Sequence, residues 1–435
     1  MKKVSPYVVI ALSFLSIIVI GTILLWLPIS QQEEGSLSFV NALFISTSAV
    51  TITGLSPVIS LAATLSIFGK IVLAILIQIG GLSVVTLSVF IMYLIGAKIG
   101  ITNRILIKES FNQNSLSGMV KLVIRIVVFT LIIETIGFIF NLFVFLQDYE
   151  VMDAIGISAF HAIAAFNNSG FDIIGSSNLI GYNGNVMLNM NTTLLIMIGG
   201  IGFVVINDII EKKSYKKLMI HSKIVLIMNA ILWVSGTLMF KVSQIHSMQK
   251  YTWLEAFFLS VTARTAGFTT INLSTLSALS TLILLILMFI GASPASTGGG
   301  VKTTTIYTLF KGASSYARGT QPLTHERLIS DETRHKASVL LTTALGIIAL
   351  STISLLALEN ISLDVALFET VSAFSNTGLS MSLTPTLRSG SKLLLCLVMF
   401  MGRVGPLTII SLLNQKWHKK DLNHIEYIEE KMMIG

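Results

Sequence analysis

Four stretches decide the fold of this chain: FISTSAVTITGL (44–55), FHAIAAFNNSGF (160–171), FFLSVTARTAGF (257–268) and FETVSAFSNTGL (368–379). Each begins with Phe and has a Gly ten residues later, which is followed by Leu or Phe. The glycines, at intervals of 97 to 116 residues, are Gly54, Gly170, Gly267 and Gly378. One such match would carry no weight, but four of them predict a fourfold internal repeat.

The composition around these stretches is that of a membrane protein. Of 435 residues, 53% are hydrophobic and only 11% are charged, against about 25% charged residues in soluble proteins. The mean hydropathy is +0.82. A soluble enzyme is excluded, because so few charges could not keep a chain of this size in solution. The single cysteine, Cys396, excludes a disulfide framework.

Eight stretches are apolar enough to cross a bilayer, which takes about 20 residues. Six of them are uncharged, and two carry one charge each, Glu134 and Arg403. The eight are 6–27, 71–97, 126–147, 186–207, 224–240, 271–301, 337–358 and 393–415. The first lacks the small-residue cleavage site of a signal peptide, so we expect it to remain as a helix.

The basic residues indicate the orientation of the chain in the membrane. Lys and Arg gather before the first span, on every second connection and after the last span, whereas the other connections are mostly acidic. In a membrane protein this pattern, with the net charge of +8, marks cytoplasmic loops and not a nucleic-acid site. The sequence predicts a multi-pass membrane protein with both termini in the cytoplasm.

Each predicted outer connection contains one of the four repeated stretches, which are too short to cross twice and too apolar for an exposed loop. A re-entrant element fits, in which a short helix enters the membrane and an extended stretch returns. The predicted fold is an all-α polytopic membrane protein with eight transmembrane helices, built from four helix–re-entrant pore loop–helix repeats with pseudo-fourfold symmetry. The predicted boundaries are repeat 1 at 1–97 (pore loop 38–57), a cytoplasmic linker at 98–118, repeat 2 at 119–212 (pore loop 152–172), repeat 3 at 213–307 (pore loop 252–270, intramembrane gate loop 291–302), a cytoplasmic linker at 308–336, repeat 4 at 337–415 (pore loop 363–381) and a cytoplasmic tail at 416–435.

Four short helices that point inward would bring their partially negative C-terminal ends to one axis. The extended stretches behind them would turn backbone carbonyls to that axis, where a ring of carbonyls can replace the water shell of a cation such as K⁺. The residues predicted to line this ion path, with a cation bound by the carbonyls at the four glycines, are Thr51, Ile52, Thr53, Gly54, Asn168, Ser169, Gly170, Thr265, Ala266, Gly267, Asn376, Thr377 and Gly378. The alternative is that each Gly only ends a short helix.

The sixth span is interrupted by GASPASTGGG at 291–300. In a helix, Pro costs about 3 kcal/mol and each of the three consecutive glycines about 1 kcal/mol, so the helix is expected to break here. A break at membrane depth must be buried in protein or line a cavity. Because the segment lies beneath the third pore loop, it is predicted to be a flexible gate. The alternative is a plain kink. The predicted gate residues are Gly291, Ala292, Ser293, Pro294, Ala295, Ser296, Thr297, Gly298, Gly299, Gly300, Lys302 and Arg403. A phosphate-binding loop is rejected, because the spacing and the strand–turn–helix context are both missing.

Several ionisable residues lie in apolar surroundings. Arg403 is a functional candidate because a charge inside a membrane is costly, and it would act as an electrostatic barrier to cations. Lys302 either contributes to this barrier or snorkels to the inner interface. Arg264 braces the third pore loop or points to outer water. Glu134 is protonated, or paired with Arg125 or with another helix. Of the remaining polar groups, His161 is expected to be packed, Asp208 and Glu211 to be interfacial, and the pairs Gly80–Gly81 and Gly199–Gly200 to allow close helix packing.

These motifs resemble the Trk/Ktr/HKT superfamily of potassium transporters, and most closely the membrane subunit of bacterial Ktr potassium uptake systems. The resemblance covers essentially the whole chain. It rests on the segments TITGL (51–55), NNSGF (167–171), RTAGF (264–268), SNTGL (375–379), FIGASPASTGGGVKTTT (289–305) and MGRVGPLT (401–408). It implies a location in the bacterial plasma membrane and a single-chain selectivity filter, in which K⁺ is bound by the backbone carbonyls at Gly54, Gly170, Gly267 and Gly378. Gly54 implies a preference for potassium, since members with Ser at this position are associated with sodium.

The resemblance also implies partners and a role for Arg403. It implies a homodimer and a separate cytosolic ring of regulatory subunits with a nucleotide-binding fold, since this chain has no GxGxxG motif of its own. Arg403 is implied to pair with carbonyls of the gate loop. No covalently bound cofactor is expected, and Na⁺ as a coupling or activating ion is left open.

The sequence therefore predicts potassium uptake through a gated filter, and not an enzyme, because no catalytic constellation is present. The first rival is a poorly selective or sodium-permissive cation transporter. The second is a membrane scaffold that transports nothing and whose glycines only serve packing.

Overall fold

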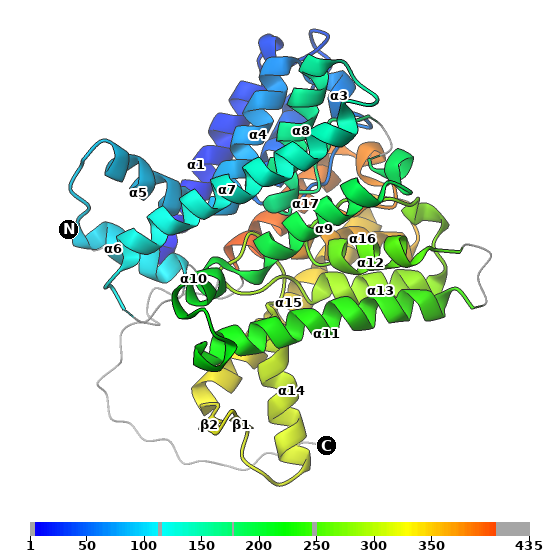
Figure 1. The fold of residues 1–435 in the computed structure, drawn as a ribbon. Helices are drawn as coiled ribbons and strands as arrows, with labels where there is room; N and C mark the ends of the chain where they lie inside the picture. The colour runs from blue at the N-terminus through cyan, green and yellow to red at the C-terminus, as the bar shows by residue number, and fades with distance from the viewer. Residues whose placement is uncertain (1–4, 112–114, 176–177, 246–249, 406–435) are drawn as a thin grey trace.

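The computed structural model describes residues 5–111, 115–175, 178–245 and 250–405, and these are mostly helical (Figure 1). The α-helices are α1 (Pro6–Trp26), α2 (Phe39–Val50), α3 (Leu61–Thr64), α4 (Ile67–Leu82), α5 (Val84–Leu94), α6 (Ile101–Ser110), α7 (Met119–Phe145), α8 (Val151–Phe166), α9 (Val186–Ile201), α10 (Phe203–Lys212), α11 (Ile220–Ser243), α12 (Trp253–Thr262), α13 (Ala278–Phe289), α14 (Thr303–Ala317), α15 (Asp331–Leu358), α16 (Leu363–Ser375) and α17 (Ser389–Val404). Single 3₁₀ turns occur at η1 (Pro28–Ser30), η2 (Ile180–Tyr182), η3 (Tyr215–Lys217), η4 (Leu273–Thr275) and η5 (Thr384–Thr386). The predicted tail at 416–435 lies outside the described residues.

The same order of elements occurs four times along the chain. A long helix is followed by a shorter apolar helix, an irregular segment that carries one of the four glycines, and a second helix. The four sets are α1–α2–α4, α7–α8–α9, α11–α12–α13 and α15–α16–α17. The shorter helices α2, α8, α12 and α16 are called pore helices below.

Four helices, α1, α7, α11 and α15, are each long and apolar enough to cross a membrane. Two helix pairs also pass this test together, but they are bent, by 98° between α4 and α5 and by 91° between α9 and α10. The sequence places one span in each of 71–97 and 186–207, and the structure divides both. The bends occur at residues with positive φ, Ser83 (72°) and Gly202 (105°), where an α-helix cannot continue.

The structure also places the ends of the helices in two other predicted spans. The helix in 271–301, α13, ends at Phe289, directly before the predicted gate loop. In the stretch 393–415, α17 ends at Val404, and the residues beyond 405 are outside the described part of the chain. Arg403 lies in the last turn of α17.

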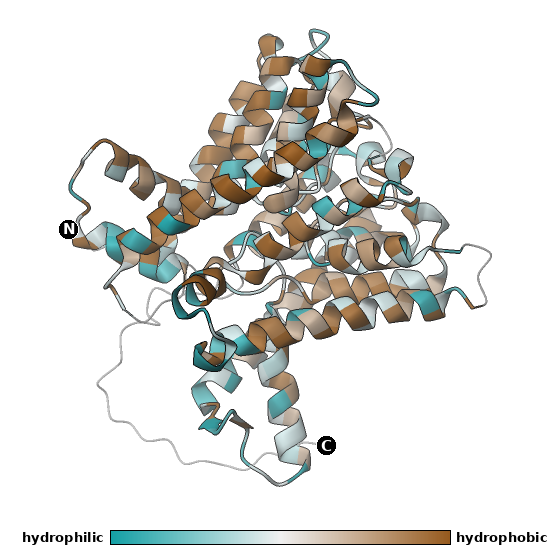
Figure 2. Ribbon diagram, in the orientation of Figure 1, coloured by the Kyte–Doolittle hydropathy of each residue, from teal (hydrophilic) through white to brown (hydrophobic). Residues whose placement is uncertain are grey.

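The outer faces of the long helices are apolar. Val19, Ile132, Val234 and Leu350 are each between 49% and 69% exposed, and Figure 2 shows hydrophobic residues along the outer sides of α1, α7 and α11. Large exposed apolar surfaces of this kind are not solvated well by water and fit a lipid environment.

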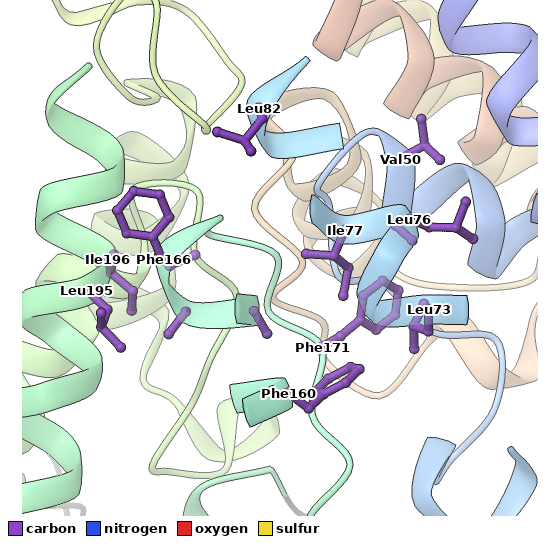
Figure 3. Close-up of a cluster of buried hydrophobic side chains, with 14 of the residues drawn as sticks. Val50, Leu73, Leu76, Ile77, Leu82, Phe160, Phe166, Phe171, Leu195 and Ile196 are labelled. Atoms are coloured by element: carbon purple, nitrogen blue, oxygen red, sulfur yellow. The ribbon is translucent and has the colours of Figure 1, made fainter. Parts of the chain in front are cut away.

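The interior packs each pore helix against helices of its own and neighbouring sets. In one cluster, Phe160 and Phe166 of α8 lie near Ile77 of α4 and Leu195 of α9, and all four side chains are buried (Figure 3). Phe171, which follows the second glycine, fills the same cluster. Phe171, the bulky residue directly after Gly170, thus anchors the irregular segment in the core.

The predicted linkers contain regular structure. Helix α6 lies within 98–118, and most of α14 lies within 308–336. Figure 1 shows α14 extending away from the rest of the molecule, next to a hairpin of two short antiparallel strands, β1 (Leu323–Thr324) and β2 (Arg327–Leu328).

Candidate functional site

The four pore helices end in the same backbone conformation. In each, a residue with positive φ follows the helix, and the glycine two positions later also has a positive φ. The pairs are Ile52 (58°) and Gly54 (93°), Asn168 (59°) and Gly170 (70°), Thr265 (69°) and Gly267 (79°), and Asn376 (53°) and Gly378 (84°). The intervening residues are not in this conformation. A non-glycine residue with positive φ is strained, so four at matched positions mark a functional segment.

The backbone N–H before each glycine turns back to its own pore helix. The bonds run from Thr53 N to Ser48 O (2.7 Å), from Ser169 N to Ala164 O (2.9 Å), from Ala266 N to Thr262 O (3.0 Å) and from Thr377 N to Ser372 O (2.9 Å). These bonds satisfy the carbonyls at the helix end and fix the direction of each irregular segment.

The four segments form a closed ring in the order of the chain. A Cβ atom built on each glycine would overlap or closely approach the carbonyl oxygen that precedes the glycine of the next segment. The approaches are from Gly54 to Ser169 O, from Gly170 to Ala266 O (2.9 Å), from Gly267 to Thr377 O and from Gly378 to Thr53 O. Only glycine fits at these positions, because the space for a side chain is taken by a neighbouring backbone and because φ is positive.

The carbonyls in this ring lack partners within the described part of the chain. Thr53, Ser169, Ala266 and Thr377 are fully buried, and no donor among the described residues bonds to their backbone oxygens. A buried carbonyl normally accepts a hydrogen bond, so four without one form a concentrated set of acceptors. Backbone oxygens of this kind are ligands for a dehydrated alkali cation.

The surrounding helices strengthen the negative potential at the ring. Two of the four pore helices are capped by side chains at their N-termini: in α2, Ser38 accepts from Asn41 N (3.3 Å), and in α12, Thr252 and Glu255 form a capping box. Their C-terminal ends lie next to the glycine segments. The partial negative charge of a helix C-terminus, equivalent to roughly half an elementary charge, therefore acts at the ring four times.

A second set of repeated glycines holds the pore helices in place. A Cβ on Gly80, Gly199 or Gly402 would overlap a carbonyl oxygen at the end of the pore helix in the same set, on Val50, Phe166 and Phe374 respectively. These glycines occupy matched positions in the segments IGGL (79–82), IGGI (198–201) and MGRV (401–404). The sequence predicts only general packing here. Aligning these segments with one another would have revealed their shared role.

The predicted gate loop lies directly below the ring. A Cβ on Gly298 would overlap the side chain of Thr265, and one on Gly299 would overlap that of Asn376. Both contacts involve residues that precede a ring glycine by two positions. The loop is also hydrogen-bonded to the bend between α9 and α10, through Ser293 N to Gly200 O (3.2 Å), Thr297 N to Gly199 O (3.4 Å) and Phe203 N to Ala295 O (2.8 Å).

Two basic side chains bind carbonyls of the loop from below. The guanidinium of Arg403 donates to Thr297 O and to Gly80 O, the latter at 2.6 Å. The ammonium of Lys302 donates to Gly298 O at 2.7 Å and to Gly299 O at 3.3 Å.

A third basic residue reaches the loop from the side of the ring. Arg264 is only 4% exposed, so it does not point to outer water. It donates to Asn229 Oδ1 and to Gly291 O (3.1 Å), and Asn229 Nδ2 donates to Ser293 Oγ (2.9 Å). The sequence does not indicate a role for Asn229, because a single Asn in an apolar helix forms no distinctive pattern.

Glu134 belongs to a buried polar cluster behind the second pore helix. Its carboxyl group accepts from Gln78 Nε2 (3.2 Å) and Asn167 Nδ2 (3.0 Å), and Asn167 Nδ2 also reaches Gln78 Oε1 (2.8 Å). Arg125 bonds instead to Asn207 and Glu211. The cluster lies next to Asn168 of the ring and so supports its position.

The remaining predicted polar residues have structural contacts. His161 is buried, bonds to Thr192 Oγ1 (2.8 Å) and meets the rings of Phe145 and Phe268 edge-on. Asp208 is also buried, and it accepts from Met219 N (2.8 Å) and Ser222 Oγ (2.7 Å) at the start of α11.

Above the ring is an open cavity of about 440 Å³. All four ring glycines line it, together with the residues that follow them in each set. The ring thus lies between this cavity and the predicted gate loop.

Comparison with known proteins agrees with this geometry. Residues 2–424 match the model of the TrkH family, described as cation transport protein. The chain is 34% identical to Ktr system potassium uptake protein B of Bacillus subtilis, over 100% of this chain and 97% of that protein. It is also 34% identical to potassium/sodium uptake protein NtpJ of Enterococcus hirae, over 100% of this chain and 98% of that protein.

A solved structure shows the same fold. The crystal structure of the potassium transporter TrkH from Vibrio parahaemolyticus matches with a TM-score of 0.74, at 19% identity, over 96% of this chain and 86% of that chain. Together with the apolar helices and the family match, this makes the protein a helical, multi-pass membrane protein. The chain belongs to the TrkH family of cation transport proteins.

Proposed function

We propose that this protein takes up potassium through the ring at Gly54, Gly170, Gly267 and Gly378. The ion is bound by the backbone carbonyls of the residues that precede these glycines, Thr53, Ser169, Ala266 and Thr377. The observation that carries the proposal is the set of four buried carbonyls without donors among the described residues, joined in a closed ring. Such oxygens replace the water of a dehydrated cation. The names of relatives at 34% identity, which refer to potassium uptake, support K⁺ as the substrate.

The proposed architecture is four pore-loop repeats with the boundaries given above and eight membrane spans. Its support is the fourfold order of long helix, pore helix and second helix. In this proposal both termini face the cytoplasm, as the distribution of Lys and Arg indicates.

The proposed gate is the loop 291–302 together with Arg403. The loop lies below the third and fourth segments of the ring, next to Thr265 and Asn376. Carbonyl oxygens of the loop accept hydrogen bonds from Arg403, Lys302 and Arg264. Opening then requires these contacts to break. The positive charges of Arg403 and Lys302 also oppose the passage of cations while the loop is closed.

Regulation and assembly extend this proposal. We expect a homodimer and a separate cytosolic subunit with a nucleotide-binding fold; the word "system" in the name of the Bacillus relative supports the separate subunit. Helix α14 offers exposed apolar side chains for such a contact, including Phe310 and Tyr316. The linkers 98–118 and 308–336 would form the binding surface.

The second candidate is a transporter that also carries sodium or depends on it. The name of the Enterococcus relative, potassium/sodium uptake protein, favours this candidate. Both candidates use the same ring and differ in the selectivity of its carbonyls.

Uptake by the purified protein in liposomes tests the proposed function. We expect K⁺ flux driven by a membrane potential, exceeding Na⁺ flux measured under the same gradient. Equal fluxes would favour the sodium-permissive candidate. The absence of any cation flux from folded, inserted protein, with and without a cytosolic partner, would favour a scaffold instead.

A further inference from the structure

The residues two positions after the ring glycines form a second repeated set. They are Ser56, Asp172, Thr269 and Ser380, and all four line the cavity above the ring. Each side-chain oxygen accepts a backbone N–H a few residues later. The bonds come from Val58 N (3.3 Å), Ile174 N (3.2 Å), Ile271 N (3.2 Å) and Leu383 N (3.3 Å).

These turns show that the local structure does not require a carboxylate. Ser56 and Thr269 make the same turn as Asp172, to the N–H two residues later, as hydroxyl groups commonly do. Ser380 differs, because it accepts from the N–H three residues later and donates to the carboxylate of Glu369. The negative charge of Asp172 is therefore additional to what its turn needs, and Ser56 and Thr269 serve as an internal comparison within one chain.

The charge of Asp172 is held at the cavity wall and is not neutralised there. Asp172 Oδ2 accepts from Asn178 Nδ2 at 2.8 Å. Asn178 is fixed in turn, because its Oδ1 accepts from Leu179 N (3.0 Å) and Thr269 N (3.1 Å). Among the described residues, no Lys or Arg lines this cavity and none forms an ion pair with Asp172.

We propose that Asp172 binds the hydrated monovalent cation in the outer cavity before the ion reaches the ring. This inference rests on the proposed function and adds an outer binding site to it. A fixed negative charge inside a narrow cavity raises the local concentration of cations and the rate at which they enter. The cavity, at about 440 Å³, has room for a cation that keeps part of its water.

The first test is Asp172→Asn in proteoliposomes at pH 8, where a carboxyl group is ionised. We expect the KM for K⁺ uptake to rise about three- to tenfold, with a smaller change in the maximal rate. Adding impermeant salt should raise the KM of the unchanged protein towards that of the variant, because salt screens the charge. Asp148→Asn removes an exposed outer carboxylate that does not line the cavity, and it should leave the KM unchanged.

The second test separates the charge from the bond to Asn178. In the double variant Asp172→Asn/Ser56→Asp, the carboxylate moves to the matched position of the first set, next to the same cavity. We expect this variant to recover most of the lost affinity. Failure to recover it, together with a KM that does not respond to salt, would mean that Asp172 only positions Asn178. A wild-type KM in Asp172→Asn would also overturn the proposal.

A binding measurement distinguishes this inference from the proposed function. The rise in melting temperature of the detergent-solubilised protein on titration with KCl reports binding without transport. We expect the half-saturating KCl concentration to increase three- to tenfold in Asp172→Asn. Binding that depends on Asp172 in a protein without flux would support the outer site and contradict the proposed function. Flux with binding that is independent of Asp172 would do the reverse.

Discussion

Replacing Gly378 by Ala should reduce potassium uptake to the background level. Gly378 has a φ of 84°, and a Cβ there would overlap the carbonyl oxygen of Thr53 and approach Gly54 Cα to 3.0 Å. The strain of a side chain at this φ alone is about 1–3 kcal/mol, and the overlap also displaces a carbonyl of the ring. One methyl group would therefore disturb two of the four segments. Uptake of K⁺ into liposomes, measured at equal protein density, checks this result.

Two alanine variants of other glycines serve as matched controls. Gly319 also has a positive φ (62°), but a Cβ there meets no atom within 4 Å, so Gly319→Ala tests the strain without the overlap. Gly390 lies near the start of α17 with equally open space and tests the substitution alone. We expect both to transport like the unchanged protein. Normal uptake by folded Gly378→Ala protein would mean that the glycines do not form the ion path.

Deleting residues 293–299 should increase uptake by about tenfold or more, if the closed loop leaves only a minor fraction of the protein open. The deletion removes the segment whose glycines contact Thr265 and Asn376 below the ring. Its ends can be joined with little movement, because Ala292 N already bonds to Gly299 O at 3.3 Å and Gly291 adjoins Gly300. Initial rates of K⁺ uptake into liposomes measure the change.

Arg403→Gln tests the same gate without shortening the chain. It weakens the bonds to Thr297 O and Gly80 O, so we expect a smaller increase in uptake than the deletion gives. Selectivity for K⁺ over Na⁺ should persist in both variants, since the ring remains. If both variants fold, insert and transport no faster than the unchanged protein, the loop is a kink and not a gate.

The sequence predicts the membrane class, the chain order of the elements and the four ring segments well. Phe and Gly recur at one spacing because the same backbone conformation occurs four times and requires the same residue types each time. The break in the helix between α13 and α14 is also evident in the sequence, since Pro294 and the glycines at 298–300 are incompatible with a continuous helix.

Features that depend on contacts between distant segments could not be predicted in the same way. The bend at Ser83 follows from a positive φ at a residue type that ordinarily continues a helix acceptably. Arg264 and Asn229 form their bonds across 35 positions of the chain, and neither residue alone indicates the other. The role proposed for Asp172 depends on a cavity that the sequence does not reveal, and the structure places its carboxylate in the wall of that cavity with the hydroxyl groups of Ser56 and Thr269.

The position of a bound cation tests the central claim most directly. Tl⁺ replaces K⁺ in many sites and scatters anomalously, so a crystal structure of transport-competent protein grown with Tl⁺ would locate the ion. We expect an anomalous peak on the axis of the ring, surrounded by the carbonyl oxygens of Thr53, Ser169, Ala266 and Thr377. Tl⁺ bound only elsewhere, with none inside the ring, would contradict the account.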